Sequence, residues 1–425
     1  MAKGLVLAGG GAKGSYQIGV WKALTELNWM PEIITGTSIG SLNGALLAQG
    51  DYETARAMWL TLHEEDILSL PADNTLPEIS AFVKDAIRSG GMDVEPLEKM
   101  VMHFVDENKL RHGKVKFGLV TVEQKKLKAC ELALDEIPEG RLAEYLLASA
   151  ACFPALRPRI IDGKKFIDGG YRDNMPFNLA KRMGATELVT VDINGIGITK
   201  PNLTGLPTIA VHCYWELGDL FAVNREQAQR NMELGYNDTF RAFGKLRGTA
   251  YAIRPEHARE QLAALRKPFN ACMRRLADET LALELTGKAA LTLFRAEDKP
   301  LAFLECAAKA AEVAPTPIYT VEELAKAFLK AYDPEKFRRL DGLFDPDGPD
   351  GLDILRGITD PQELVAAVAY RAWAPQFAPD QWDVLDEAND PDPWWELFAN
   401  DEKENRKVIS AQSALRLPEN ESTKP

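Results

Sequence analysis

The sequence predicts an α/β fold in the N-terminal part of the chain, followed by a helical C-terminal region. Leu5–Ala8 is a short apolar run that leads into a glycine-rich loop and then into a helical pattern. Ile33–Thr37 is rich in β-branched residues and leads into a sharp turn and a second helical pattern. Buried strands that alternate with helices in this way are typical of α/β proteins.

Both helices carry apolar residues three or four positions apart, which places these side chains on one face of each helix. The residues are Tyr16, Val20, Leu24, Leu27, Ile39, Leu42 and Leu46. The segment 51–110 is expected to be mostly helical. Further strands are expected at 115–122, 187–193 and 208–214, a helix at 142–151, and a hairpin over 159–168 that turns at Asp162–Gly163.

From about residue 216 onward the pattern is helical, and it includes the stretches 273–294, 301–313 and 321–332. We therefore expect two domains, an α/β domain over 1–250 and a helical region over 251–425. The position of the helical region after the α/β domain is compatible with a lid or an assembly element.

Composition and charge limit the classes of partner. The chain has 425 residues and a formal net charge of −13, which argues against nucleic acid and against electrostatic capture by anionic lipid. The five cysteines are scattered and include no C-x-x-C pair, so reduced thiols in a cytoplasmic protein are expected. Neither a signal peptide nor a transmembrane segment is expected.

Gly36–Gly40 has the form G-x-S-x-G, with Ser38 between a strand and a helix. In a nucleophile elbow this context lifts the serine hydroxyl out of the sheet, and glycines leave room for the sharp turn. The same letters also occur in ordinary strand-to-helix turns. Ser38 is therefore a candidate nucleophile, supported by Gly36 and Gly40.

The first loop contains three successive glycines, Gly9, Gly10 and Gly11, followed by Lys13 and Gly14. Glycines expose backbone N–H groups, so the loop can form an anion-binding nest. The loop also fits G-x-G-x-x-G, the dinucleotide fingerprint, which would make the chain a nucleotide-binding oxidoreductase. That fingerprint requires an acidic residue at the end of the second strand, where this chain has Ser38 instead.

Asp168 ends a predicted strand and is followed by Gly169 and Gly170, with Asn174 shortly after. An Asp-Gly pair most often forms a turn. Here an earlier Asp-Gly already closes the hairpin, and the two glycines would let another segment approach the Asp168 carboxylate.

Together these three stretches resemble the patatin-like phospholipase family over about residues 4–245. Phe153–Pro154, Pro176 and the segment Leu234–Thr239 add to the resemblance. It implies a three-layer α/β/α sandwich with a largely parallel central sheet, and a Ser38–Asp168 dyad. It also implies an oxyanion hole at Gly9–Gly11 and lipid or other acyl-ester substrates, with a phospholipase A or lysophospholipase-like activity.

The resemblance implies no catalytic histidine, and the five histidines show no catalytic context. They are His63, His103, His112, His212 and His257. Lys13 is expected either to position the glycine loop or to meet an anionic head group, with a solvated lysine as the alternative. A non-catalytic lipid-binding protein on the same fold is the remaining alternative function.

We expect no cofactor and no metal. The acidic segment 345–351 lacks the closing glutamate of a calcium loop and is interpreted as a turn cluster. The aromatic segment 393–398 suits either a protein core or peripheral contact with a membrane.

Overall fold

The structure is a computed structural model that describes residues 2–63, 90–92, 94–274, 276, 279–293, 299–344 and 351–377. The chain divides into two compact units. One contains Met1–Pro255 with Ala314–Ile318, and the other contains the residues from Glu256 to Val313 and from Tyr319 onward. The acidic turn cluster before Gly351 and the aromatic segment 393–398 lie outside the described residues.

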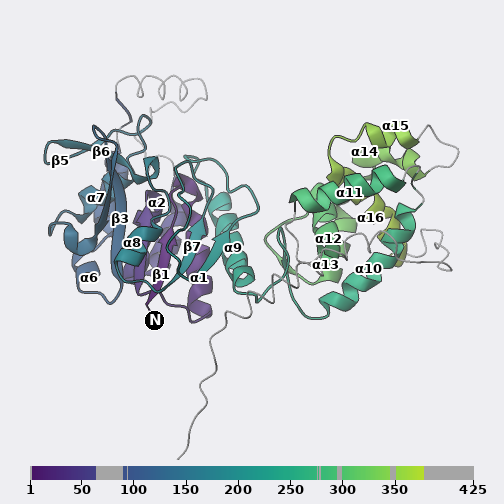
Figure 1. The fold of residues 1–425 in the computed structure, drawn as a ribbon, viewed down its shortest axis with the longest axis horizontal. Coiled ribbons are helices and arrows are strands. Elements are labelled where there is room, and N and C mark those ends of the chain that lie inside the picture. Colours follow the sequence, from purple (N-terminus) through teal and green to yellow (C-terminus); the bar gives the residue numbers. More distant parts are fainter. Residues whose placement is uncertain are drawn as a thin grey trace, which may run out of the picture. The chain divides into compact units, whose positions relative to one another are not determined.

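A mixed, mostly parallel sheet forms the centre of the N-terminal unit (Figure 1). Its strands are β1 (Lys3–Leu7), β2 (Ile33–Thr37), β3 (Lys116–Glu123), β4 (Lys128–Ala133), β5 (Arg159–Ile161), β6 (Lys164–Asp168), β7 (Glu187–Asp192) and β8 (Thr208–His212). The strand order is β5-β6-β3-β2-β1-β7-β8, with β4 paired to β3. The neighbours from β3 to β8 run parallel, while β4 and β6 pair antiparallel with β3. The predicted α/β class is therefore confirmed.

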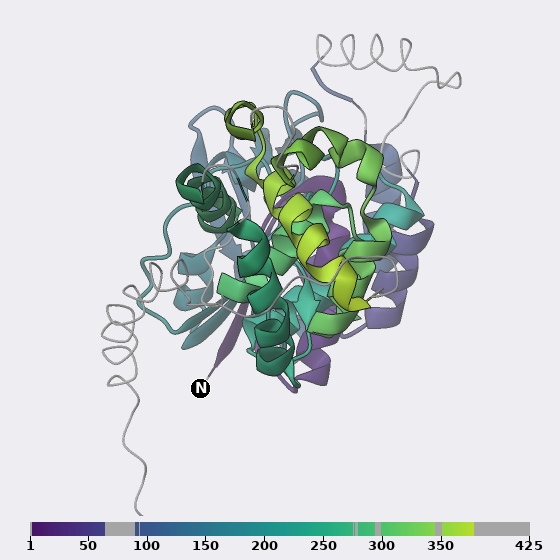
Figure 2. The same cartoon turned by 90° about the vertical axis from the view of Figure 1, so that its right-hand side faces the viewer.

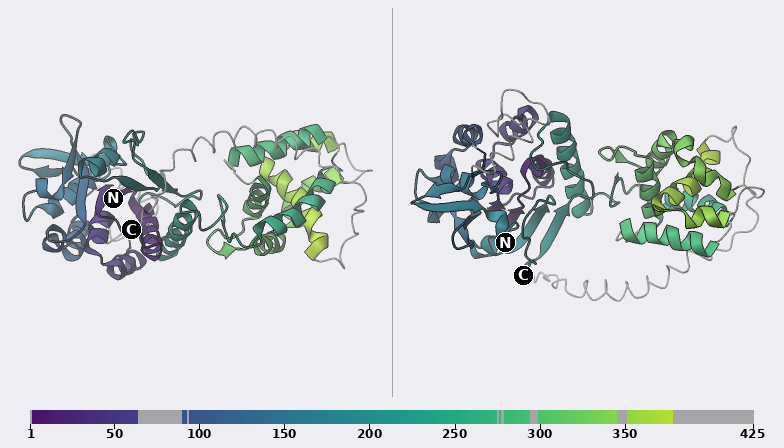
Figure 3. Two further views of the ribbon diagram at one scale, coloured as in Figure 1. Left: turned by 60° about the horizontal axis from the view of Figure 1, so that its bottom comes forward. Right: turned by 90° about the horizontal axis from the view of Figure 1, so that it is seen from above.

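Helices cover both faces of this sheet (Figures 1 and 3). They are α1 (Ser15–Glu26), α2 (Ile39–Gln49), α3 (Tyr52–Thr61), α5 (Glu95–Phe104), α6 (Glu107–Arg111), α7 (Leu142–Ser149), α8 (Phe177–Arg182) and α9 (Arg225–Ala242). Gly44 of α2 lies against Ile34, whereas the neighbouring Thr35 hydroxyl donates to the carbonyl of Pro176, next to α8. Because successive strand residues face opposite sides, α2 and α8 lie on opposite faces.

The C-terminal unit is helical in its described part. Its helices are α10 (Ala258–Met273), α11 (Glu279–Leu293), α12 (Lys299–Ala310), α13 (Val321–Ala331), α14 (Pro334–Phe337), α15 (Gly351–Arg356) and α16 (Pro361–Phe377). Helix α16 packs against α10, α11, α12 and α13, and Figure 2 shows it among the green helices. The short strands β9 (Ala252–Ile253) and β10 (Ile318–Tyr319) pair with each other, and of their residues only Tyr319 belongs to the C-terminal unit.

Several elements differ from the sequence-based prediction, and two of these differences have a clear physical reason. Strand β4 was not expected, because its residues are half exposed and show no apolar run, and its pairing with β3 is what makes it a strand. The helix expected from residue 216 begins only at Arg225. There the Asn224 side chain accepts the Gln227 N–H and caps the helix, a signal that apolar spacing alone does not reveal.

Strand β3 brings two distant strand ends together. Strand β4 occupies one edge of β3, so β2 and β6 share the other. Thr37 of β2 pairs with Val120, and Asp168 of β6 pairs with the next residue, Thr121. Because β2 and β6 run in opposite directions along this edge, their carboxyl ends lie next to each other. This register places the turn after β2 beside the turn after β6.

Ser149, the last residue of α7, fastens this junction. Its Oγ accepts the Ser38 N–H at 2.9 Å and donates to the Val120 carbonyl at 2.6 Å. The side chain is fully buried, with 0% exposed surface. One hydroxyl therefore satisfies two backbone groups that would otherwise be buried without partners.

Replacing Ser149 with alanine should lower the free energy of unfolding by about 1–3 kcal/mol, because both backbone groups lose their partner. Chemical denaturation of the two proteins measures this difference. Ser41→Ala is the matched control: its hydroxyl donates to the Ser38 carbonyl, which also accepts the N–H groups of Ser41 and Leu42. Equal losses in the two variants would contradict a special role for Ser149.

Candidate active site

The turn between β2 and α2 has the geometry of a nucleophile elbow. Ser38 has φ 55° and ψ −127°, a strained conformation for a residue with a side chain. A Cβ on Gly36 would lie 2.7 Å from the Ser41 nitrogen, and one on Gly40 would lie 2.6 Å from the Ala8 carbonyl oxygen. Both positions therefore require glycine.

Asp168 ends β6 beside this elbow. Its carboxylate accepts the Gly170 N–H at 2.7 Å, and its side chain is 6% exposed. Burial raises the pKa of Asp168 from about 3.8 to about 6, although hydrogen bonds from Ser38 and Gly170 partly offset this rise. The carboxylate is thus a stronger base than an exposed aspartate and is still mostly ionised at neutral pH.

The glycine loop lies next to the elbow. A Cβ on Gly9 would lie 3.0 Å from the Ser38 Cβ and 2.6 Å from the Asn174 Oδ1. Gly11 has φ 55°, so the turn into the 3₁₀ helix η1 (Gly11–Gly14) uses a conformation that suits glycine. Within the described part of the chain, the N–H groups of Gly10 and Gly11 donate to no protein acceptor. Unpaired N–H groups of this kind can bind an anion.

Two polar side chains hold this loop in place. The Asn174 side chain is buried and donates to the Gly9 carbonyl at 3.3 Å. The Lys13 ammonium donates to the Asn194 carbonyl at 2.9 Å. This contact supports the positioning role among the alternatives for Lys13, because it connects the loop to the turn after β7.

A network of buried polar side chains connects the helix after the elbow with the glycine loop. The Asn43 side chain donates to the Gly14 carbonyl and to Gln17, each at 2.9 Å, and accepts the Trp59 indole N–H at 3.0 Å. Gln17 in turn donates to the Ala8 carbonyl at 2.8 Å. The network therefore joins the glycine loop to α1, α2 and α3.

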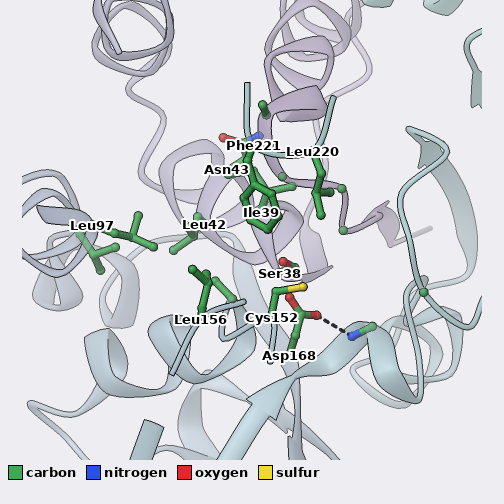
Figure 4. A pocket seen from close by; sticks show the side chains of 18 of the residues that line it. Ser38, Ile39, Leu42, Asn43, Leu97, Cys152, Leu156, Asp168, Leu220 and Phe221 are labelled. Atoms are coloured by element: carbon green, nitrogen blue, oxygen red, sulfur yellow. Dashed lines mark hydrogen bonds between the residues drawn. The ribbon is translucent and has the colours of Figure 1, made fainter. Parts of the chain in front are cut away.

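Ser38 and Asp168 open into one cavity of about 430 Å³ (Figure 4). Its wall is mostly apolar, with side chains from α2, α3, α5 and several loops. They include Leu42, Leu46, Met58, Leu62, Leu97, Met100, Val101, Phe104, Leu156, Leu220 and Phe221. None of the five histidines is among the described residues that line it; His212, for example, is exposed on β8. The cavity suits an apolar chain next to a serine and a carboxylate.

Sequence reasoning missed three residues around Ser38 and Asp168. The Ser149 hydroxyl accepts the backbone N–H of Ser38 in the elbow. Cys152 lines the cavity beside Asp168 (Figure 4), and burial raises the pKa of its thiol to about 11. Tyr171 lines the cavity as well, and its hydroxyl donates to the Phe153 carbonyl. Cys152 directly precedes Phe153–Pro154, and Tyr171 directly follows Asp168–Gly170. This proximity to the sequence motifs is the one signal that could have indicated the two residues.

Among the residues that the structure describes, no three or more His, Cys, Asp or Glu side chains are grouped so that they could hold a metal ion. The helices of the same residues include none with the length and apolar character of a membrane span.

The raised pKa of Asp168 implies that this residue destabilises the fold at neutral pH. Its pKa is higher in the folded state, so the stability contributed by its protonated form is lost as pH rises from about 4 to about 6. Asp168→Asn should therefore raise the free energy of unfolding near pH 7 by about 1–3 kcal/mol and change it little near pH 4.

Urea denaturation at the two pH values measures this difference. The control is Asp162→Asn in the exposed hairpin turn, where the carboxylate pairs with Arg141 at the surface and should contribute less than about 1 kcal/mol. A destabilised Asp168→Asn at neutral pH would contradict the prediction.

Residues 5–181 match the family described as patatin-like phospholipase. Lysophospholipase NTE1 of Mycosarcoma maydis is 27% identical over 208 residues, which are 48% of this chain and 10% of that protein. Patatin-like phospholipase domain-containing protein 6 of Mus musculus is 29% identical over 194 residues, which are 44% of this chain and 13% of that protein.

The chain thus matches only about a tenth of the length of these relatives. The crystal structure of VipD from Legionella pneumophila is similar at 16% identity and a TM-score of 0.36, covering 86% of this chain and 91% of that chain. The match over 5–181 includes the glycine loop, the elbow and Asp168. Residues 5–181 of the chain therefore form a patatin-like phospholipase domain.

Proposed function

We propose that the N-terminal unit is a lipid acyl hydrolase that cleaves carboxylic esters through Ser38 and Asp168. The observation that carries this proposal is the meeting of the two residues in one apolar cavity, beside a loop with unpaired N–H groups. The sequence match to proteins named lysophospholipase and patatin-like phospholipase supports lipid as the source of the ester.

In the first step Asp168 accepts the Ser38 hydroxyl proton while the Oγ attacks the ester carbonyl. The N–H groups of Gly9, Gly10 and Gly11 are the candidate donors to the tetrahedral oxyanion, and one such donor typically contributes about 2.7–4 kcal/mol. Collapse of the intermediate expels the alcohol, which takes the proton from Asp168. This leaves an acyl group on Ser38.

In the second step a water molecule attacks the acyl-enzyme. Asp168 accepts a proton from this water, and the Ser38 Oγ leaves and regains a proton as the fatty acid is released. A base with a pKa of about 6 suits both steps, since it is ionised near neutral pH and its conjugate acid still donates a proton to the leaving group.

Ser38→Ala should reduce hydrolysis of a p-nitrophenyl butyrate substrate by at least about 10³-fold, because the nucleophile is absent. Asp168→Asn should cause a comparable loss, and wild-type turnover should fall as pH drops through about 6. Stopped spectrophotometric assays with EDTA present measure these rates, with Asp162→Asn as the control that retains activity. Equal turnover by wild type and Ser38→Ala would exclude Ser38 as the nucleophile.

The wall formed by α3 and α5 should limit the length of the acyl chain. Val101 on α5 lines the cavity and is 4% exposed, whereas the adjacent Met102 is 61% exposed and does not line it. Val101→Trp should therefore lower kcat/KM for a p-nitrophenyl palmitate substrate at least about tenfold more than for the butyrate, because the larger side chain fills the space for a long chain.

Met102→Trp should leave the ratio of the two kcat/KM values unchanged. The ratio is the informative quantity, since a general loss of folded protein lowers both rates equally. If Val101→Trp has the same ratio of kcat/KM for the palmitate and the butyrate as the wild type, the acyl chain does not bind against Val101.

A further inference from the structure

The mouth of the cavity exposes apolar side chains to water. Ile196 is 82% exposed, Ile198 51%, Tyr171 38% and Phe221 37%, and all four also line the cavity. Large apolar side chains that cluster on a surface are unfavourable in water and usually mark an interaction site. We call these four residues the rim.

The rim is held in this exposed position by the main chain. The Ile198 N–H donates to the Gly170 carbonyl at 2.8 Å, and the Ile198 carbonyl accepts the Asn174 N–H at 2.9 Å. Gly195 packs against the glycine loop, since a Cβ there would lie 2.7 Å from the Gly10 Cα. The segment before Ile196 and the segment after it are therefore both fixed to the site.

The second rim segment is fixed in the same way. The Ala12 N–H, at the start of η1, donates to the Leu220 carbonyl at 2.8 Å, next to Phe221. Ile196 and Phe221 are therefore exposed on two loops that main-chain hydrogen bonds hold in place. The loop with Ile198 is bonded to the turn after Asp168, and the loop with Leu220 is bonded to the glycine loop. The rim and the candidate catalytic groups form one connected structure.

Charge indicates which kind of partner the rim fits. Among the described residues that line the cavity, Asp168 is the one that carries a formal charge at neutral pH. The Lys200 ammonium is paired with the buried Asp173 carboxylate at 3.1 Å. The Lys13 ammonium, near the start of the rim segment, donates to the Asn194 carbonyl at 2.9 Å, and the whole chain carries a net charge of −13. Attraction to anionic surfaces is thus disfavoured, whereas apolar contact requires no charge.

We propose that Ile196, Ile198, Tyr171 and Phe221 dock the cavity mouth onto a neutral, zwitterionic lipid surface. The apolar wall of the cavity continues directly into this rim, so an acyl chain can pass from the lipid to Ser38 without crossing water. The proposal rests on the proposed acyl hydrolase function for its substrate, but the docking itself requires no turnover.

The test uses the full chain carrying Ser38→Ala, so that lipid hydrolysis cannot alter the membrane, with sedimentation of sucrose-loaded phosphatidylcholine vesicles. Ile196→Asp in this background should weaken vesicle binding about tenfold or more, because a charge replaces an apolar contact. Ile196→Trp should bind at least as well as the parent, because tryptophan suits the interface. Ile160→Asp is the matched control: Ile160 is 63% exposed on β5 and is not among the cavity-lining residues.

Binding should persist when the salt concentration is raised, since it depends on apolar contact. Equal binding by the Ile196→Asp and Ile160→Asp proteins would overturn the proposal, as would the absence of vesicle binding by the parent. Self-association that Ile196→Asp abolishes, without vesicle binding, would assign the rim to a second copy of the chain. Failure of the hydrolase proposal is detected separately, as the absence of p-nitrophenyl butyrate turnover in the wild type.

Discussion

Strands β2 and β6 approach each other along a single edge of β3, and neither can extend further without meeting the other. Residues paired with Val120 and Thr121 are consequently neighbours, although Thr37 and Asp168 are far apart in the chain. The chain must therefore leave the sheet directly after Thr37, at the elbow, and again directly after Asp168. The strained φ of Ser38 and the glycines around both turns follow from this shortage of space.

The same crowding determines the electrostatics of the site. Asp168 has one backbone donor and one hydroxyl partner instead of the cation that a buried carboxylate would need for a low pKa. The raised pKa therefore lowers the stability of the fold at the position proposed for the catalytic base. Stability and function commonly oppose each other at sites of this kind.

The sequence located the turns of the site because their requirements are local. Three glycines before a helix and a serine between glycines restrict the backbone in ways that a pattern can reveal. Ser149 could not be found in this way, since its partner Ser38 is 111 residues distant and its hydroxyl resembles any other near the end of a helix. Strand β4 was missed for a related reason: its pairing partner, rather than its own composition, makes it a strand.

The groups proposed for chemistry and the walls of the cavity come from different parts of the chain. Ser38, Asp168 and the glycine loop belong to strand ends and are fixed by backbone contacts, whereas much of the wall consists of side chains on α3 and α5. Mutation of those helices can therefore change the shape of the cavity while the proposed catalytic groups stay in place. If the proposed reaction is correct, such a division allows descendants of one ancestral protein to diverge in specificity through gradual changes in helices that contribute no proposed catalytic group.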